Sequence, residues 1–202
     1  MPILPRLLEN GFSQPQNNGI VEDYLSIDLT TTKFLSKAMT NKDFFKACLT
    51  NELAATAQTI KALPNDQMDY RPHPVNRSAY EIAEHIIAHA FDFNVILNES
   101  VCDECLVMPF KSAEEGAQLL TAFWEKAIST VDAMDESSFN TVDVELLVSG
   151  KPLLTIPRSN MLWFFLFDII HHRGQLSTYI RPMGGKNPAV YGYSFDSLQL
   201  QP

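Results

Sequence analysis

Apolar residues recur at intervals of three and four along four segments of the chain, which is the spacing of one face of an α-helix. These segments cover about residues 42–63, 78–98 and 112–131, and a fourth begins after residues 157–160. Pro64 follows the first segment, and Gly184-Gly185, preceded by Pro182, ends the last. Because each segment is long enough for several turns, the pattern predicts four long helices.

Capping side chains precede three of these segments. Thr40-Asn41-Lys42-Asp43 carries an N-cap signal for the first helix. Ser78 with Glu81, and Ser112 with Glu115, have the spacing of a capping box. In the fourth segment, the apolar residues of Met161–Phe167 surround the helix axis, which predicts burial on all sides.

The pattern changes between the third and fourth segments. Val142–Val148 largely alternates apolar and polar residues, Ser149-Gly150 has turn chemistry, and Leu153–Ile156 is mostly apolar. A short β-hairpin is therefore expected before the last helix.

The rest of the chain divides around these elements. Residues 1–40 contain many turn formers and little helical periodicity, although a short helix is an option between Val21 and Met39. We therefore expect an all-α fold: an N-terminal extension at 1–40, a four-helix bundle at 41–186, and a C-terminal tail at 187–202.

Composition narrows the class of protein. The chain has 202 residues, of which 46% are hydrophobic, and a formal net charge of −9. That size and apolar fraction suit one globular domain, whereas the charge and the lack of a Lys/Arg cluster argue against nucleic-acid binding. Met1–Arg6 has no signal-peptide character, and Met161–Phe167 is too short to span a bilayer. We expect a cytoplasmic protein that binds neither nucleic acid nor membranes.

Cys102-Asp103-Glu104-Cys105 has CxxC spacing. A structural zinc site needs a second pair of ligands, and a redox motif of this type follows a strand and opens a helix. Neither context is evident, so an ordinary acidic loop is the preferred interpretation.

The most informative residues lie in the last helix. Asp168 and His172 are four residues apart and share one helix face. A carboxylate inside a bundle needs a hydrogen-bond partner or a cation. His85 and His89 form a second pair with the same spacing on the second helix. One of these histidines, together with Asp168 and His172, could hold Zn, Fe, Ni or Mn and leave a position for water or substrate.

Two segments resemble the DinB/YfiT-like superfamily. His171-His172-Arg173-Gly174-Gln175-Leu176, followed by Tyr179-Ile180-Arg181 and Gly184-Gly185, is similar to its last-helix signature. Ser78-Ala79-Tyr80-Glu81-Ile82-Ala83-Glu84-His85 is similar to its second helix. The likeness covers roughly residues 42–185. It implies an up-down-down-up four-helix bundle, often dimeric, with a divalent metal ion held by three histidines.

Carried over by position, the resemblance implies His85 and His172 as metal ligands. The third ligand is usually histidine, but Asp168 stands there in this chain. The expected site is therefore His85, Asp168 and His172, and His89 or His171 could substitute for one of them.

Each of these residues also has a structural interpretation. Asp168 could accept a hydrogen bond from His171 or His172 without a metal, and His85 could bond a neighbouring helix. Arg173 is expected to pair with Glu81 or Glu84. Gly174 suggests close helix packing, and Gln175 suggests hydrogen bonding beside the ligands.

Two classes of function remain open. An enzyme would use the metal to activate water or a thiol, as the superfamily implies for hydrolases and thiol-dependent transferases; Glu84, His89 and His171 are the candidate bases. A non-catalytic, stress-associated bundle would bind a metal or small molecule. A cleft beside Asp168, lined by aromatic residues, would favour the enzyme. The expected partners are a small-molecule substrate or thiol and a second copy of the chain.

Overall fold

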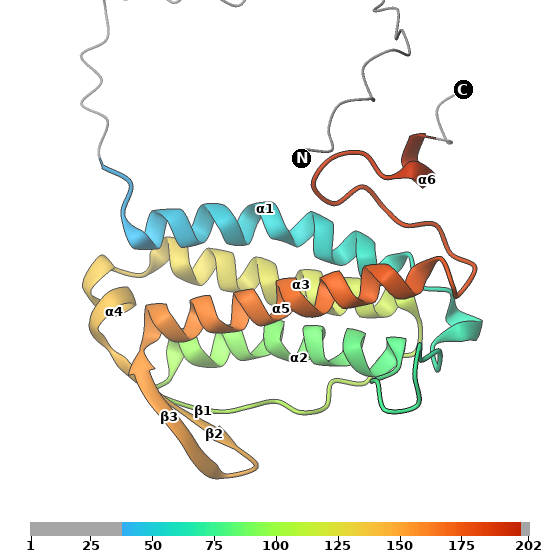
Figure 1. Cartoon of the computed structure of the whole chain (residues 1–202). Helices are drawn as coiled ribbons and strands as arrows, with labels where there is room; N and C mark the ends of the chain where they lie inside the picture. The colour runs from blue at the N-terminus through green and yellow to red at the C-terminus, as the bar shows by residue number, and fades with distance from the viewer. Residues whose placement is uncertain (1–37, 199–202) are drawn as a thin grey trace, which may run out of the picture. The chain divides into compact units, whose positions relative to one another are not determined.

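Four long helices form the body of the protein in a computed structural model, which describes residues 38–198 (Figure 1). The long helices are α1 (Asn41–Lys61), α2 (Ala79–Asn98), α3 (Ala113–Ala133) and α5 (Arg158–Ile180). The shorter elements are a 3₁₀ turn η1 (Asn65–Gln67), β1 (Val101–Asp103), α4 (Glu136–Thr141), β2 (Asp143–Val148), β3 (Lys151–Pro157) and α6 (Phe195–Leu198). The short helix considered between Val21 and Met39 lies almost wholly outside the described residues.

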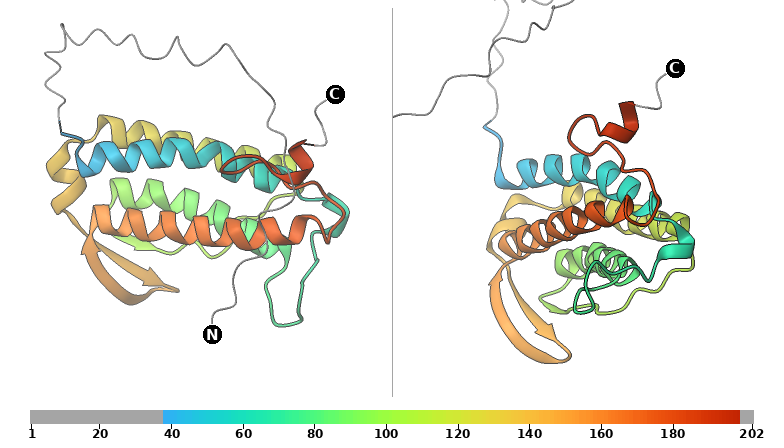
Figure 2. Two further views of the ribbon diagram at one scale, coloured as in Figure 1. Left: turned by 45° about the horizontal axis from the view of Figure 1, so that its top comes forward. Right: turned by 45° about the vertical axis from the view of Figure 1, so that its right-hand side comes forward.

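The long helices pack as a four-membered bundle in which α2 and α1 each contact both α3 and α5 (Figures 1 and 2). Helices α1 and α5 run in one direction, and α2 and α3 run in the other. Two consecutive helices can be parallel here because residues 99–112 return along the length of the bundle. The predicted up-down-down-up bundle is confirmed. No helix within residues 38–198 is long and apolar enough to cross a membrane.

Local capping starts three helices as predicted. Thr40 Oγ1 accepts from the amide of Asp43 at 3.1 Å. At α2 the capping box is complete, because Ser78 Oγ accepts from Glu81 N and Glu81 Oε2 accepts from Ser78 N. At α3 only half of the box forms: Ser112 caps Glu115 N, but the Glu115 carboxylate accepts from Lys111 N instead.

The predicted hairpin is present as β2 and β3, paired antiparallel. Ser149 and Gly150 have φ values of 52° and 73°, the left-handed pair that a tight two-residue hairpin turn requires. The third strand, β1, pairs parallel with β2 and was not predicted. The expectation of an acidic loop is therefore wrong for Val101–Asp103.

The two cysteines next to this sheet are not poised for redox chemistry. Cys102 lies on β1 with no exposed surface, and burial raises the pKa of its thiol to about 12. Burial and the nearby Asp92 carboxylate also raise the pKa of Cys105. The raised pKa values favour the protonated thiol at neutral pH, so neither cysteine is a ready nucleophile.

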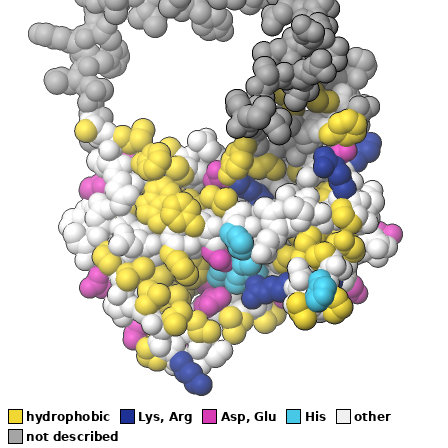
Figure 3. Space-filling model, viewed as in Figure 1, with side chains coloured by type: hydrophobic (Ala, Val, Ile, Leu, Met, Phe, Trp, Pro, Cys, Tyr) yellow, Lys and Arg dark blue, Asp and Glu magenta, His cyan; other side chains and the backbone are white. Residues whose placement is uncertain are grey.

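The first half of α5 is not buried on all sides, contrary to the expectation for Met161–Phe167. Phe164 and Phe167 are 50% and 61% exposed. Trp163 stacks on Phe167 and also contacts Phe44 of α1, with ring centroids 5.5 and 5.6 Å apart. We call Phe44, Trp163, Phe164 and Phe167 the aromatic face, which belongs to the hydrophobic surface over α1 and α5 in Figure 3. The sequence predicted the apolar character of this segment correctly, but not that this side of α5 is left exposed within residues 38–198.

Arg173 has a different partner from the predicted one. Its guanidinium pairs with Glu52 of α1, donates to Thr56 Oγ1 at 3.1 Å and contacts the hydroxyl of Tyr191. The predicted partner Glu81 is instead bound by Arg71, through bonds of 2.7 and 2.8 Å. Arg173 lies five residues after Asp168, which turns it about 140° around the helix, away from α2 and toward α1.

The expectation of close packing at Gly174 is also wrong. A Cβ atom built at Gly174 meets nothing within 4 Å. The residue lies on the exposed side of α5, so helix contact does not explain the glycine.

Candidate metal centre

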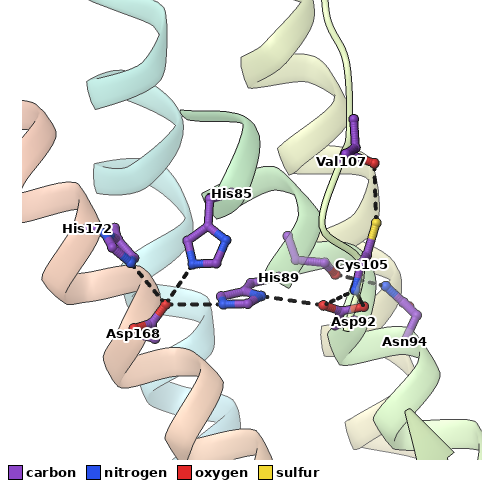
Figure 4. Close-up of polar contacts among 9 residues, drawn as sticks. His85, His89, Asp92, Asn94, Cys105, Val107, Asp168 and His172 are labelled. Atoms are coloured by element: carbon purple, nitrogen blue, oxygen red, sulfur yellow. Dashed lines mark hydrogen bonds and ion pairs between the residues drawn. The ribbon is translucent and has the colours of Figure 1, made fainter. Parts of the chain in front are cut away.

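Three histidines surround one carboxylate oxygen where α2 faces α5 (Figure 4). Oδ2 of Asp168 lies 3.2 Å from His85 Nε2, 3.1 Å from His89 Nε2 and 3.3 Å from His172 Nε2. The structure thus brings the predicted residues His85, Asp168 and His172 together, and it adds His89.

Helix periodicity explains this arrangement. His85 and His89 are four residues apart on α2, and Asp168 and His172 are four apart on α5, so each pair forms a row along its helix. The two helices lie side by side with these rows facing each other. The His85, His89 and His172 side chains are only 12%, 5% and 14% exposed, and that of Asp168 is 31% exposed.

Of the two substitute ligands considered, only His89 belongs to the cluster. His171 is exposed on α5, and its Nε2 lies 2.9 Å from the amide of Gln175. The same glutamine presents Oε1 to His172 Nδ1 at 2.9 Å. Gln175 therefore hydrogen-bonds beside a candidate ligand, as predicted, and it orients the imidazole of His172.

Asp92 is the residue that sequence analysis missed. It lies three residues after His89 on α2, has no exposed surface, and places Oδ2 3.4 Å from His89 Nδ1. The backbone amide of Cys105 donates to both carboxylate oxygens at 3.2 Å. The i, i+3 spacing from His89 was the available signal.

The cluster shifts the pKa values of its members. Burial would raise the pKa of Asp168, but hydrogen bonds from His172, His85 and His89 outweigh burial and hold it far below its usual range. Burial lowers the pKa of His85. Burial would also lower the pKa of His89, but bonds to Asp168 and Asp92 outweigh it and raise that pKa. Asp168 is thus a carboxylate throughout the physiological range, as a metal ligand must be.

The donor set fits a divalent metal ion. Two ligand atoms about 2.0–2.1 Å from a tetrahedral metal are about 3.3 Å apart, which is close to the distances of 3.2 and 3.3 Å from His85 Nε2 and His172 Nε2 to Asp168 Oδ2. Ligand atoms of His85, Asp168 and His172 all lie within 4.8 Å of one another. Imidazole and carboxylate ligands suit Zn, Fe, Ni and Mn, the metals expected from the sequence.

A pocket of about 280 Å³ opens beside His85. Its lining is charged rather than aromatic, in contrast to the cleft envisaged from the sequence: Arg77, Glu81, Glu84, His85, Glu104 and Leu106. Of the three candidate bases, Glu84 lines this pocket, His89 is in the cluster and His171 faces away. Partial burial raises the pKa of Glu84.

Comparisons with solved structures agree with this architecture. The DinB-like protein YjoA from Bacillus subtilis matches with a TM-score of 0.57 and 18% identity, over 74% of this chain and 99% of that one. A DinB-like protein from Bacillus cereus matches with a TM-score of 0.58 and 20% identity, over 73% and 95%. YfiT from B. subtilis, described as having an unusual four-helix bundle topology, matches with a TM-score of 0.52 and 15% identity, over 71% and 87%.

Sequence comparison identifies the family. The chain is 26% identical to the uncharacterized protein YjoA of B. subtilis over 147 residues, which is 67% of this chain and 82% of YjoA. The sequence model of the DinB family matches residues 39–202, the whole chain apart from the N-terminal extension. On this evidence and that of the fold, the chain belongs to the DinB family.

Proposed function

We propose that this protein is a metal-dependent hydrolase whose divalent ion is held by His85, Asp168 and His172. The observation that carries the proposal is the convergence of these three donors, one of which, His85, also lines a pocket that contains the Glu84 carboxylate. The structural neighbour YfiT, described as a probable metal-dependent hydrolase, supports the same assignment. A non-catalytic metal-binding bundle is the alternative; the pocket beside His85, with the Glu84 carboxylate in its lining, supports the enzyme.

A bound divalent ion would supply one form of chemistry here, which is to lower the pKa of a water molecule or a thiol so that it becomes a nucleophile at neutral pH. Asp168 contributes a negative charge that a third histidine would not. That charge favours harder ions and reduces the net positive charge of the site.

The chain's own residues supply the other functions. Glu84 can accept a proton at its carboxylate from a nucleophile in the pocket. Arg77, on the same pocket wall, can bind an anionic group of the substrate. The acidic carboxylates around it, Glu81 and Glu104, disfavour a strongly anionic substrate, so a small neutral or zwitterionic molecule fits best.

Replacing Glu84 by glutamine should lower kcat for an activated ester about 100-fold or more while leaving metal affinity within about twofold. The reason is that the amide cannot accept the proton but is not a ligand. Kinetics of metal-loaded protein and a chelator-competition titration measure the two quantities. Glu125→Gln, an exposed carboxylate on α3, is the matched control.

The outcome of the same assay separates the candidates. Turnover of a thiol-plus-electrophile pair without ester hydrolysis would indicate the thiol-dependent transferase instead. No metal-dependent turnover of either kind would contradict the enzyme and favour the non-catalytic bundle.

We also propose a homodimer formed through the aromatic face. Half-exposed Phe164 and Phe167 next to Trp163 make an apolar surface that a soluble monomer would rarely present. Phe167→Glu should convert the dimer to a monomer, because it places a charge in the buried interface. Light scattering measures the mass, and Tyr193→Glu, at an 82% exposed aromatic residue elsewhere, is the control. A wild-type protein that is monomeric at tens of micromolar would contradict the dimer.

The remaining proposals follow from charge and composition. A net charge of −9 opposes binding to DNA or RNA at physiological salt. We therefore propose that the protein acts in the cytoplasm and that its partners include neither nucleic acid nor a membrane.

A further inference from the structure

Residues 104–106 directly follow strand β1 and form one wall of the pocket beside His85. Glu104 and Leu106 line the pocket from this segment. The rest of the lining lies on α2 or just before it: Arg77, Glu81, Glu84 and His85. The segment belongs to no helix or strand, so the shape of the pocket on this side depends on what holds its backbone.

The β2–β3 hairpin holds this wall from one side. Asp103, the last residue of β1, accepts a hydrogen bond from the backbone amide of Gly150, whose nitrogen lies 3.1 and 3.2 Å from the two carboxylate oxygens. The next amide along the chain, that of Glu104, donates to the carbonyl of Leu147 on β2 at 2.9 Å. The hairpin turn therefore contacts the segment that enters the pocket, although the two are more than forty residues apart in the sequence.

Helix α2 holds the wall from the other side. The amide of Cys105 donates to both carboxylate oxygens of Asp92 at 3.2 Å (Figure 4). Asp92 has no exposed surface, and a buried carboxylate is costly unless hydrogen bonds or a cation compensate it. Within residues 38–198 no lysine or arginine pairs with Asp92, and its other side-chain partner is His89. The bond to Cys105 is thus both charge-assisted and shielded from water.

Both supports are parts of the hydrophobic core. Cys102 of β1 and Val144 and Leu146 of β2 are at most 1% exposed and pack in the core. Hydrogen bonds at three successive residues therefore hold the pocket wall between two fixed elements. A wall that is already ordered spares the substrate the entropic cost of ordering it, which favours binding.

We infer that Asp92 and Asp103 are positioning residues for substrate binding, which fix the pocket wall that carries Glu104 and Leu106. This inference rests on the proposed function, because it takes the pocket beside His85 as the substrate site. Neither aspartate lines the pocket, so both act through the backbone of the wall. They affect the affinity for the substrate and leave the chemical step unchanged.

Replacing Asp103 tests this role at an exposed position, where folding is not at risk. Asp103→Ala removes the acceptor of the Gly150 amide, whereas Asp103→Asn keeps an acceptor oxygen. For metal-loaded protein and an activated ester, Asp103→Ala should raise KM about two- to tenfold, as expected for one hydrogen bond, and change kcat less than about twofold. Asp103→Asn should restore the KM of the wild type, which a general loss of stability would not explain.

Amide hydrogen exchange tests the same constraint without turnover. Exchange at Glu104 and Cys105 should be faster in Asp103→Ala than in the wild type and unchanged in Asp103→Asn. Asp92→Ala removes the acceptor of the Cys105 amide itself and should accelerate exchange there more strongly, with circular dichroism as the folding check. Asp143→Ala is the control, because Asp143 is an exposed residue of β2 whose side chain has no hydrogen-bond partner within residues 38–198.

The outcomes separate this inference from the proposed function. Ester hydrolysis with the same KM in Asp103→Ala and the wild type would overturn the inference and keep the hydrolase. Unchanged exchange at both amides in Asp103→Ala would overturn it whatever the activity. Faster exchange that Asp103→Asn reverses, in a protein without metal-dependent hydrolysis, would support the fixed wall and contradict the hydrolase.

Discussion

Replacing Arg173 by alanine should lower the free energy of unfolding by about 3–5 kcal/mol. The Arg173 and Glu52 side chains are only 3% and 13% exposed, so the truncation leaves the Glu52 carboxylate buried without its cation. The loss also removes the bond to Thr56 and the stacking of the guanidinium over Tyr191. Urea denaturation of the purified protein measures the change.

Two further variants make that test specific. The exposed pair of Arg181 and Asp196 is the matched control, because Arg181→Ala should cost no more than about 1 kcal/mol. Replacing Glu52 and Arg173 together, by glutamine and methionine, should recover much of the stability, since no unpaired charge remains. An Arg173→Ala variant as stable as Arg181→Ala would show that the pair contributes little.

Replacing His85, Asp168 or His172 by alanine should weaken binding of a divalent ion more than about 100-fold. Losing only a hydrogen-bond partner of a metal ligand already lowers metal affinity about 10- to 100-fold, and here the ligand itself is removed. Elemental analysis of equally folded variants measures the occupancy. His73→Ala, an exposed histidine outside the cluster, should retain full occupancy. Asp168→His should keep the metal and shift preference toward borderline ions such as Zn, because it exchanges a hard oxygen ligand for imidazole. If the alanine variants keep their metal, the ion is bound elsewhere.

Much of the fold was predictable because it is determined locally. Capping at Ser78 and the Ser149-Gly150 turn depend on residues a few positions apart, and both are as expected. Strand β1 was missed because its pairing with β2 joins residues more than forty positions apart, and three residues carry no periodicity.

In the candidate site, too, local features were predictable and contacts between helices were not. Pairs four apart on one helix predicted that His85 and His89, and Asp168 and His172, form rows. Local spacing does not reveal which helices face each other. The facing helices determine the partner of Arg173 and the contact between His89 and Asp168. The spacing of Asp92 from His89 was a local signal, whereas its bond from the Cys105 amide, in the α2–α3 connection, could not be read from spacing.

The most direct test of the metal centre is an anomalous difference map from crystals of the protein grown with Zn²⁺, recorded at the zinc absorption edge. The account predicts one strong peak per chain, about 2.0–2.2 Å from His85 Nε2, a carboxylate oxygen of Asp168 and His172 Nε2. Direct histidine–Asp168 hydrogen bonds with no peak among them, or a zinc peak only at another place, would contradict it.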